Sequence, residues 1–460
     1  MRRPPPGLSA PGFPRDLVAR RPPPGGSAAR VVGSLALSVL VACPAPRGPS
    51  AVTIAPQTVE LGRPGAVLSG VAGDEKTAFA ALASAKPTAK TTIEAIKAGT
   101  LPPAWHTELD GSGGPLALVG RVVVGALGGT GHVAGIELRG QPGAVVVALD
   151  AATGSIAWQR AIDATEWSVV SALAATSDGV LVGGSFSGTL RIGATVVSSA
   201  GKSDGFVARL TAAGGVGWLV RIGGPGGDAV QGVAASGDRI AIAGTFAAGA
   251  DLLGQPLPPY DERSPYADGF VAELDATGAR RWAQTFGGKA DESVAGVAID
   301  AHGRIVVAAT VRDTVHLGSA DLVANGAADG LVAWWASDGE AGPAVLIGGA
   351  DFDGLRAIAA AGDHALVGGF FSGAIRLGTR ALTAGGGDDA FLAELDASGN
   401  VVAAWPVSGD GREEVTALTA IPGGFVAGIA HTAAATVGSD VLPAPRDPLS
   451  GAAIVVRPVR

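Results

Sequence analysis

The sequence predicts an all-β protein, a six-bladed β-propeller of four-stranded antiparallel blades. Three observations lead to this fold class. One sequence phrase recurs at a nearly constant interval, glycine is abundant while charge is scarce, and the last repeat lacks a strand that the N-terminal part of the chain can supply. Arrays of one β unit at a fixed period are typical of propellers and solenoids.

The repeated phrase has the form "DGFVAELDATGARRW", and its copies begin near residues 144, 205, 269, 330, 390 and 452. The successive intervals are 61, 64, 61, 60 and 62 residues. Each interval contains several short apolar segments separated by Gly turns, as in "DATG", where a glycine suits the positive φ of a hairpin loop. We therefore expect four strands per unit, joined as an antiparallel meander.

The four strands of a unit differ in composition, which predicts their order from the axis outward. The first, such as "VAGVAID" from Val294, alternates small with branched residues and should be innermost, where neighbouring blades crowd. The second and third are apolar on both faces, as expected for sheets packed between other sheets. The fourth contains Trp158, Trp218, Trp282 or Trp405, which suits the outer rim between blades.

The two ends of the chain suggest closure of the ring. The last unit ends after its third strand, from Ala452, and an additional outer-type segment, "AWHTELDG" from Ala104, precedes the first inner strand at Pro115. An N-terminal outer strand that pairs with the C-terminal blade would leave no unpaired edge. We therefore assign residues 104–460 to the propeller and residues 44–103 to a linker, in which the spacing of Thr91 and Glu94 fits the start of a short helix.

The N-terminal residues 1–43 have the organisation of an export signal. A basic, proline-rich lead precedes twelve apolar residues, Val31 to Ala42, which is too short for a membrane span. The sequence "LVAC" then resembles the bacterial lipobox, with Cys43, the one cysteine of the chain, as the lipidated residue. This resemblance implies a lipoprotein anchored in the outer membrane of the cell envelope. The alternative is a signal peptide with an incidental cysteine.

Composition excludes several classes of partner and site. Residues 1–43 carry six arginines and one acid, a net charge of +5, so the chain total of −8 leaves −13 for residues 44–460. An acidic body without a Lys/Arg cluster is unsuited to nucleic acid. A single cysteine allows no internal disulfide, and no histidine spacing indicates a metal site. We expect no cofactor, no metal and no catalytic motif, and a monomer.

The pattern "DGFVAxLDxxGxxxW…FGG" resembles the bacterial β-propeller repeat known as SBBP, over residues 104–460. That resemblance implies a fold but no particular activity. The segment "VVALDAATGSIAWQRAID" from Val146 also resembles a quinoprotein-type propeller repeat, and so brings in the lipoprotein propeller scaffold of outer-membrane protein assembly as a comparison. No position matches the catalytic carboxylate of the quinoprotein dehydrogenases.

Candidate ligand-binding residues lie at repeat-related loops and at departures from the repeat. An acid precedes the inner strand in five units: Glu166, Asp228, Asp291, Asp353 and Glu413. These acids either form a collar at the channel mouth, able to hold a cation or a basic peptide, or each caps the amides of its own turn. Arg356 interrupts an inner strand, where it would face the channel, and Tyr260 and Tyr266 lie in the longest loop.

The function expected from these features is a non-catalytic binding or scaffold platform for an envelope protein or a glycan. Two alternatives remain. One is a hydrolase or lyase of extracellular polysaccharide that uses the collar carboxylates, and the other is a scaffold in outer-membrane protein assembly.

Overall fold

The computed structural model describes residues 57–60, 66–74, 77–84, 90–97, 103–139, 142–438, 440–445 and 451–458. The described residues form strands, turns and loops and no helix, so the all-β prediction is confirmed. The predicted signal peptide, including Cys43, lies outside the described residues. The part of the chain that the structure describes has no helix long and apolar enough to span a membrane.

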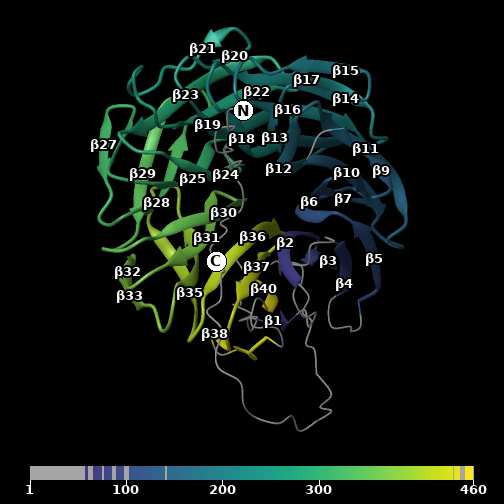
Figure 1. Cartoon of the computed structure of the whole chain (residues 1–460). Coiled ribbons are helices and arrows are strands. Elements are labelled where there is room, and N and C mark those ends of the chain that lie inside the picture. The colour runs from purple at the N-terminus through teal and green to yellow at the C-terminus, as the bar shows by residue number, and fades with distance from the viewer. Residues whose placement is uncertain are drawn as a thin grey trace, which may run out of the picture. The chain divides into compact units, whose positions relative to one another are not determined.

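The strands form sheets arranged around a central axis (Figure 1). The innermost strands are β2 (Ala66–Gly73), β6 (Ser112–Val119), β12 (Trp167–Thr176), β18 (Ala229–Ser236), β24 (Ser293–Ile299), β30 (Gly354–Ala361) and β36 (Glu413–Ile421). The second strands are β3 (Thr77–Ser84), β7 (Val122–Gly129), β13 (Gly179–Ser187), β19 (Arg239–Phe246), β25 (Ile305–Val311), β31 (His364–Phe371) and β37 (Gly424–His431).

The third strands are β4 (Lys90–Lys97), β10 (Gly143–Asp150), β16 (Asp204–Thr211), β22 (Asp268–Asp275), β28 (Asp329–Trp335), β34 (Asp389–Leu395) and β40 (Gly451–Pro458). The outer strands are β5 (Trp105–Asp110), β11 (Ile156–Ala164), β17 (Val216–Gly223), β23 (Arg280–Gly288), β29 (Ala341–Ile347), β35 (Val401–Gly409) and β1 (Gln57–Glu60). All pairings within these four-stranded blades are antiparallel, as predicted.

All six predicted blades are present, and the ring contains one blade more than the sequence predicts. The additional sheet is β2-β3-β4-β5, and its inner strand β2 contacts both β6 and β36. Residues 66–73, 77–84 and 90–97 are therefore strands of this seventh blade, and the expectation of a linker with a short helix is wrong there. Thr91 and Glu94 lie buried on strand β4. The periodicity misled because Ile93 and Ile96 fit a helical spacing as well as a strand buried on both faces.

A strand from the N-terminal part of the chain closes the ring, as predicted. This strand is β1 and not the expected segment around Trp105. Strand β1 pairs with β40, and Thr58 lies opposite Val455. The segment around Trp105 is instead strand β5, which completes the β2 blade by pairing with β4. The last blade thus combines strands from both chain ends, in the order β1-β40-β37-β36, and its outer edge is covered as predicted.

Small hairpins lie between the second and third strands of six blades. They are β8 (His132–Val133) with β9 (Ile136–Glu137), β14 (Thr189–Ile192) with β15 (Thr195–Ser198), β20 (Asp251–Leu252) with β21 (Gln255–Pro256), β26 (Thr314–Leu317) with β27 (Ala320–Val323), β32 (Ala374–Leu377) with β33 (Arg380–Thr383), and β38 (Ala435–Val437) with β39 (Asp440–Leu442). Strands β14, β20, β26 and β38 each pair with the outer strand of the preceding blade, which links successive blades.

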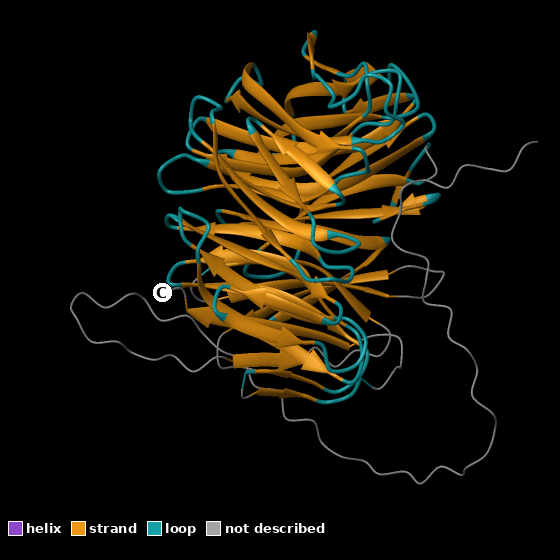
Figure 2. Ribbon diagram, turned by 90° about the vertical axis from the view of Figure 1, so that its left-hand side faces the viewer, coloured by secondary structure: helices purple, strands orange, loops and turns teal. Residues whose placement is uncertain are grey.

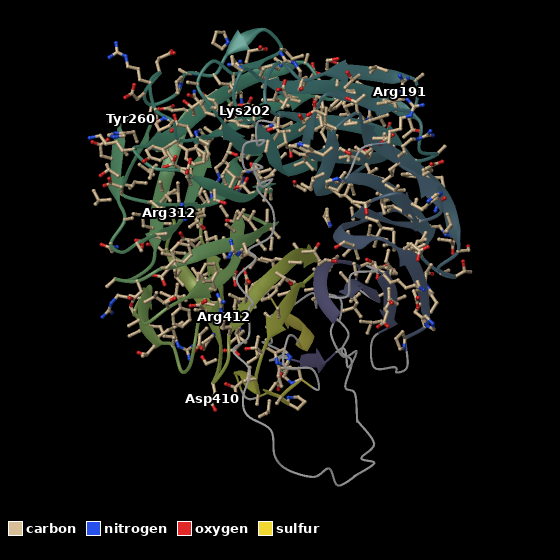
Figure 3. The ribbon with its side chains drawn as sticks, viewed as in Figure 1. Arg191, Lys202, Tyr260, Arg312, Asp410 and Arg412 are labelled. Carbon is tan, nitrogen blue, oxygen red and sulfur yellow. The ribbon has the colours of Figure 1, made fainter. Side chains whose placement is uncertain are left out.

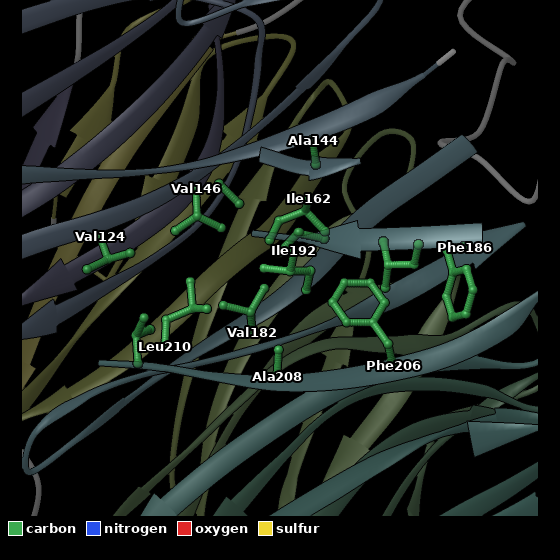
Figure 4. Close-up of a cluster of buried hydrophobic side chains, with 14 of the residues drawn as sticks. Val124, Ala144, Val146, Ile162, Val182, Phe186, Ile192, Phe206, Ala208 and Leu210 are labelled. Atoms are coloured by element: carbon green, nitrogen blue, oxygen red, sulfur yellow. The ribbon is translucent and has the colours of Figure 1, made fainter. Parts of the chain in front are cut away.

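The core lies between the faces of neighbouring blades, which stack side by side around the ring (Figure 2). In one interface, Val146 of strand β10 packs in the same cluster as Val182, Phe206 and Ala208 of the next blade (Figure 4). All four side chains are fully buried. Burial of a side chain such as Phe206 contributes about 1.5–3 kcal/mol, and each interface between blades repeats such contacts.

Two features of the blades explain sequence patterns. A Cβ atom on Gly232 would lie 2.7 Å from the backbone nitrogen of Val297 on the neighbouring inner strand, so only a glycine fits at this position. The indole N–H of Trp218 donates to Ala276 O of the next blade at 3.0 Å. The Trp218 ring packs against Gly278 of the same turn, which has a φ of +84°. The outer-strand tryptophans therefore join adjacent blades, as predicted.

Candidate functional site

Every inner strand carries a register irregularity near its start, where its pairing with the second strand skips a residue. In β18, for example, the register shifts between Val230 and Gly232, so no residue of β19 lies opposite Gln231. The residues skipped in this way are Ser69, Gly114 with Pro115, Ser171, Gln231, Ala295, Arg356 and Thr416. Bulges of this type redirect a side chain and are common next to binding sites.

These bulges surround one cavity on the ring axis, with a volume of ≈ 210 Å³. We call it the bulge cavity, defined by the polar residues Ser69, Ser171, Gln231, Arg356 and Thr416, which all contribute to its lining. Small and aliphatic residues of the inner strands form the rest of the wall. Five of the seven blades thus direct a polar side chain into a common space.

Arg356 lines the channel, as its place in the inner strand predicted. Its side chain is 40% exposed, and its guanidinium lies over the ring of Phe370 at 4.7 Å and donates through Nε to Glu414. No described residue hydrogen-bonds to its two terminal nitrogens. These donors therefore remain available to a ligand, while Glu414 compensates the positive charge.

Gln231 presents the complementary group. Its Nε2 donates to Thr245 Oγ1 at 2.9 Å, which fixes the orientation of the amide. Its Oε1 is buried, and no described residue donates to it. An orphaned buried acceptor costs about 1–3 kcal/mol, and a ligand or ordered water that supplied a donor would recover that energy.

An exposed aromatic side chain lies beside Arg356. Phe352 is 39% exposed and stacks on Phe370, with ring centroids 5.7 Å apart, and the guanidinium of Arg312 lies 5.6 Å from the Phe352 ring. These contacts form a continuous stack of side chains that ends at the cavity, in the order Arg312, Phe352, Phe370 and Arg356.

The predicted acidic collar does not exist as a set of exposed carboxylates. Asp228 accepts hydrogen bonds from the amides of Gly224 and Ala247, both at 2.8 Å. Asp353 accepts equivalent bonds from Gly349 at 2.6 Å and Ser372 at 2.9 Å. Both side chains are buried, so the collar interpretation is wrong for them and the turn-capping alternative is confirmed.

The inner-strand bulges also correct the alignment of these acids. One equivalent position lies two residues before the last paired residue ahead of each bulge. It is occupied by Ser168, Asp228, Glu292, Asp353 and Glu413. Glu166 and Asp291, which the sequence suggested, lie outside it and are exposed. Glu166 accepts a bond from Ser187 Oγ at 2.5 Å, and Asp291 accepts one from the amide of Ala267 at 2.9 Å.

The two glutamates at this position have an unusual environment. Glu292 is 4% exposed and Glu413 is 1% exposed, and no described residue donates a hydrogen bond to their carboxylate oxygens. Burial, together with the neighbouring Asp268 and Asp389 carboxylates respectively, raises the pKa of each glutamate to about 8. The pKa of Asp228 rises to about 6, mainly through burial.

In one blade an arginine side chain compensates the charge of the aspartate that corresponds to Asp268 and Asp389. Asp204 begins strand β16 in the same way that Asp268 begins β22 and Asp389 begins β34, and it forms a salt bridge with Arg221. Asp268 and Asp389 each retain a buried Oδ1 without a described hydrogen-bond donor. Glu292 and Glu413 therefore satisfy these pairs best when they are protonated.

The two tyrosines lie away from the cavity. Tyr260 is at the outer rim of the ring, where its ring stacks on His316 with centroids 4.3 Å apart (Figure 3). His316 in turn contacts Asp321 at 2.6 Å. Tyr266 is exposed on the same long loop. The structure does not bring the tyrosines together with Arg356.

Among the described residues, no group of three or more His, Cys, Asp and Glu side chains is arranged to hold a metal ion. Sequence reasoning missed Gln231, Phe352 and Glu292. The signal for Gln231 was available, because a polar residue interrupts the small and branched pattern at the same place in five blades. Phe352 gave no such signal, because it belongs to a loop outside the repeated phrase.

Comparison with protein-family models found no match, and comparison with curated proteins found none either. Among solved structures, BamB from Moraxella catarrhalis is 15% identical, with 85% of each chain covered and a TM-score of 0.41. The quinohemoprotein alcohol dehydrogenase from Comamonas testosteroni is 12% identical, with 87% of this chain and 76% of that chain covered and a TM-score of 0.39.

The β-propeller domain of the Trilobed protease from Pyrococcus furiosus is 10% identical, with 85% of this chain and 98% of that chain covered and a TM-score of 0.43. Similarity at this level carries no argument about activity or partners.

Proposed function

We propose that the protein is a non-catalytic binding platform of the cell envelope, and that it contacts an envelope protein or glycan at the mouth of the bulge cavity. The observation that carries this proposal is the convergence of Ser69, Ser171, Gln231, Arg356 and Thr416 on one axial cavity. A concave site with a few convergent polar groups on an aliphatic wall is the usual form of a ligand site.

The state of the acids supports binding rather than polysaccharide cleavage. Asp228 and Asp353 are buried and bonded to backbone amides, so neither can exchange a proton with a glycan at the channel mouth. A pair of opposed, accessible carboxyl groups is the usual requirement for glycoside hydrolysis. The alternative of a collar-based hydrolase or lyase thus loses two of its proposed groups.

Capture of partners tests this proposal directly. The tagged protein, cross-linked in solubilised cell envelope, should retain a specific partner that is lost or much reduced when both Arg356 and Gln231 are replaced by alanine. Arg191→Ala is a matched control because Arg191 is exposed on the outer hairpin strand β14 (Figure 3). Equal capture by the wild type and the Arg356/Gln231 double variant would contradict the assignment of the contact surface.

The proposed location depends on Cys43, because its sequence context resembles a lipobox. We expect the full-length protein to incorporate an alkyne-tagged palmitate and to sediment with the outer membrane. Cys43→Ser should abolish both results, since several acyl chains are needed for stable anchoring. Persistence of the label in the variant would exclude this residue as the site of attachment.

A further inference from the structure

The hydrogen-bonding groups of the bulge cavity form a mixed set. The hydroxyls of Ser69 and Thr416 donate to strand carbonyls at 3.2 and 3.4 Å, which leaves their oxygens able to accept. Gln231 Oε1 needs a donor, and the terminal nitrogens of Arg356 need an acceptor. A ligand hydroxyl satisfies both requirements because it donates and accepts, whereas a carboxylate only accepts and an ammonium only donates.

The charge of the site favours an uncharged ligand. Of the described residues that line the cavity, Arg356 alone is charged, and its salt bridge with Glu414 neutralises it. An anionic ligand would face Glu414 and an acidic protein, while a cationic ligand would face the guanidinium. A neutral ligand encounters neither repulsion.

The size and wall of the cavity indicate one small ring. A volume of ≈ 210 Å³ corresponds to about seven water molecules, which is too small for a folded chain. Its wall contains aliphatic groups, among them Val233, Val297 and Ile358, which can contact C–H bonds. A pyranose combines C–H faces with a belt of hydroxyls and so matches this lining.

The exposed Phe352 extends the site beyond the cavity. Its ring is linked through Phe370 to the Arg356 guanidinium, by contacts of 5.7 and 4.7 Å. Because Phe370 and the Arg312 guanidinium lie against the Phe352 ring, its exposed edge can contact the C–H groups of a second ring attached to the first. The arrangement therefore suits a chain of sugars more than an isolated monosaccharide.

From these observations we infer that the bulge cavity binds one sugar ring of a neutral glycan, held by Gln231 and Arg356, and that the exposed edge of Phe352 contacts the adjacent ring. This inference rests on the proposed function and names its ligand class. Glu414 holds Arg356 in place and does not itself act on the glycan.

Binding of defined neutral sugars tests the inference. The wild-type protein is titrated with maltose, cellobiose, lactose and diacetylchitobiose, and with the corresponding monosaccharides, while saturation-transfer NMR monitors binding. At least one disaccharide should bind with a Kd of about 1 mM or lower. Gln231→Ala and Arg356→Ala should each weaken it about tenfold, as expected for a lost hydrogen bond to a ligand. Phe352→Ala should weaken the disaccharide more than its monosaccharide.

Matched variants and a charged competitor decide the interpretation. Gln255→Ala and Arg191→Ala, both on outer hairpins, should bind as the wild type does, and thermal unfolding should show every variant folded. Tighter binding of glucuronate than of glucose, lost in Arg356→Ala, would overturn the neutral-ligand inference. Absence of binding by all sugars, with Arg356-dependent capture of an envelope protein, would overturn this inference and leave the proposed function intact. Absence of both would overturn the two together.

Discussion

Replacement of Glu413 by glutamine should remove much of the pH dependence of the protein's stability. The folded-state pKa of Glu413 is about 8, against an ordinary value of 4.5. Between these two values the folded protein binds more protons than the unfolded chain, so stability falls as pH rises through this window. One pKa unit corresponds to about 1.4 kcal/mol, which gives an upper limit of about 5 kcal/mol for the loss.

Glutamine tests this explanation because it resembles protonated glutamic acid in shape and cannot ionise. Its amide can donate to Asp389, the carboxylate that contacts Glu413 in the fold. Urea unfolding at about pH 5 and about pH 9 should show a large loss for the wild type and a smaller loss for the variant, which should be about 2–5 kcal/mol more stable at the higher pH. Glu292→Gln should behave in the same way, since burial likewise raises the pKa of Glu292 to about 8.

The matched control for this experiment is Glu340→Gln, because Glu340 is exposed on a turn. It should leave the pH dependence of unfolding unchanged. Identical pH profiles for the wild type and Glu413→Gln would refute the reasoning, because they would show that Glu413 is ionised or solvated in the folded protein.

Three further predictions concern the packing between blades, the capped carboxylates and a buried salt bridge. Trp218→Ala should lower the free energy of unfolding by about 2–4 kcal/mol in urea titrations, with Trp218→Phe losing less, since the ring contact with Gly278 joins two blades; equal losses would contradict this interpretation. Asp228→Asn and Asp353→Asn should each lower the free energy of unfolding by about 1–3 kcal/mol, and the melting temperature with it, because the carboxylates bond to backbone amides. Neither variant should alter partner capture; loss of capture at an unchanged melting temperature would restore the collar interpretation. Arg221→Leu should lower the free energy of unfolding by about 3–5 kcal/mol, because it leaves Asp204 buried without its salt-bridge partner; a loss no larger than that of the exposed Arg191→Ala would contradict this interpretation.

The fold could be predicted because its determinants repeat. Small residues such as Gly232 mark the inner strand where blades converge, and Trp218 and its equivalents mark the outer strand, so each prediction was made several times over. The β2 blade was missed because residues 66–97 lack the repeated phrase, and the alternation in "KTTIEAIK" resembles a helix as well as a strand. Closure by the two chain ends followed from a missing outer strand, but the sequence did not show that β1 would supply it.

The candidate site was predicted less completely because it depends on the bulges. Arg356 was recognised since a charge in an inner strand is conspicuous, whereas Gln231 was overlooked because an uncharged polar residue stands out less in such a strand, although the register places both at the equivalent position. The acids were misaligned for the same reason, since Asp291 lies next to Glu292, which occupies the buried position. Whether a carboxylate is exposed or bonded to amides depends on the fold of the loop, which residue spacing does not give.

The most direct test of the account is a cross-link between the two strands that close the ring. In a Cys43→Ser background, Thr58→Cys with Val455→Cys introduces two cysteines at directly opposed positions of β1 and β40. Mild oxidation should join them within one folded chain, while Trp105→Cys with Val455→Cys should stay reduced, since β5 belongs to another sheet. Cross-linking of the Trp105 pair, with none for the Thr58 pair, would contradict a ring closed by β1 and, with it, the position of the β2 blade beside the cavity.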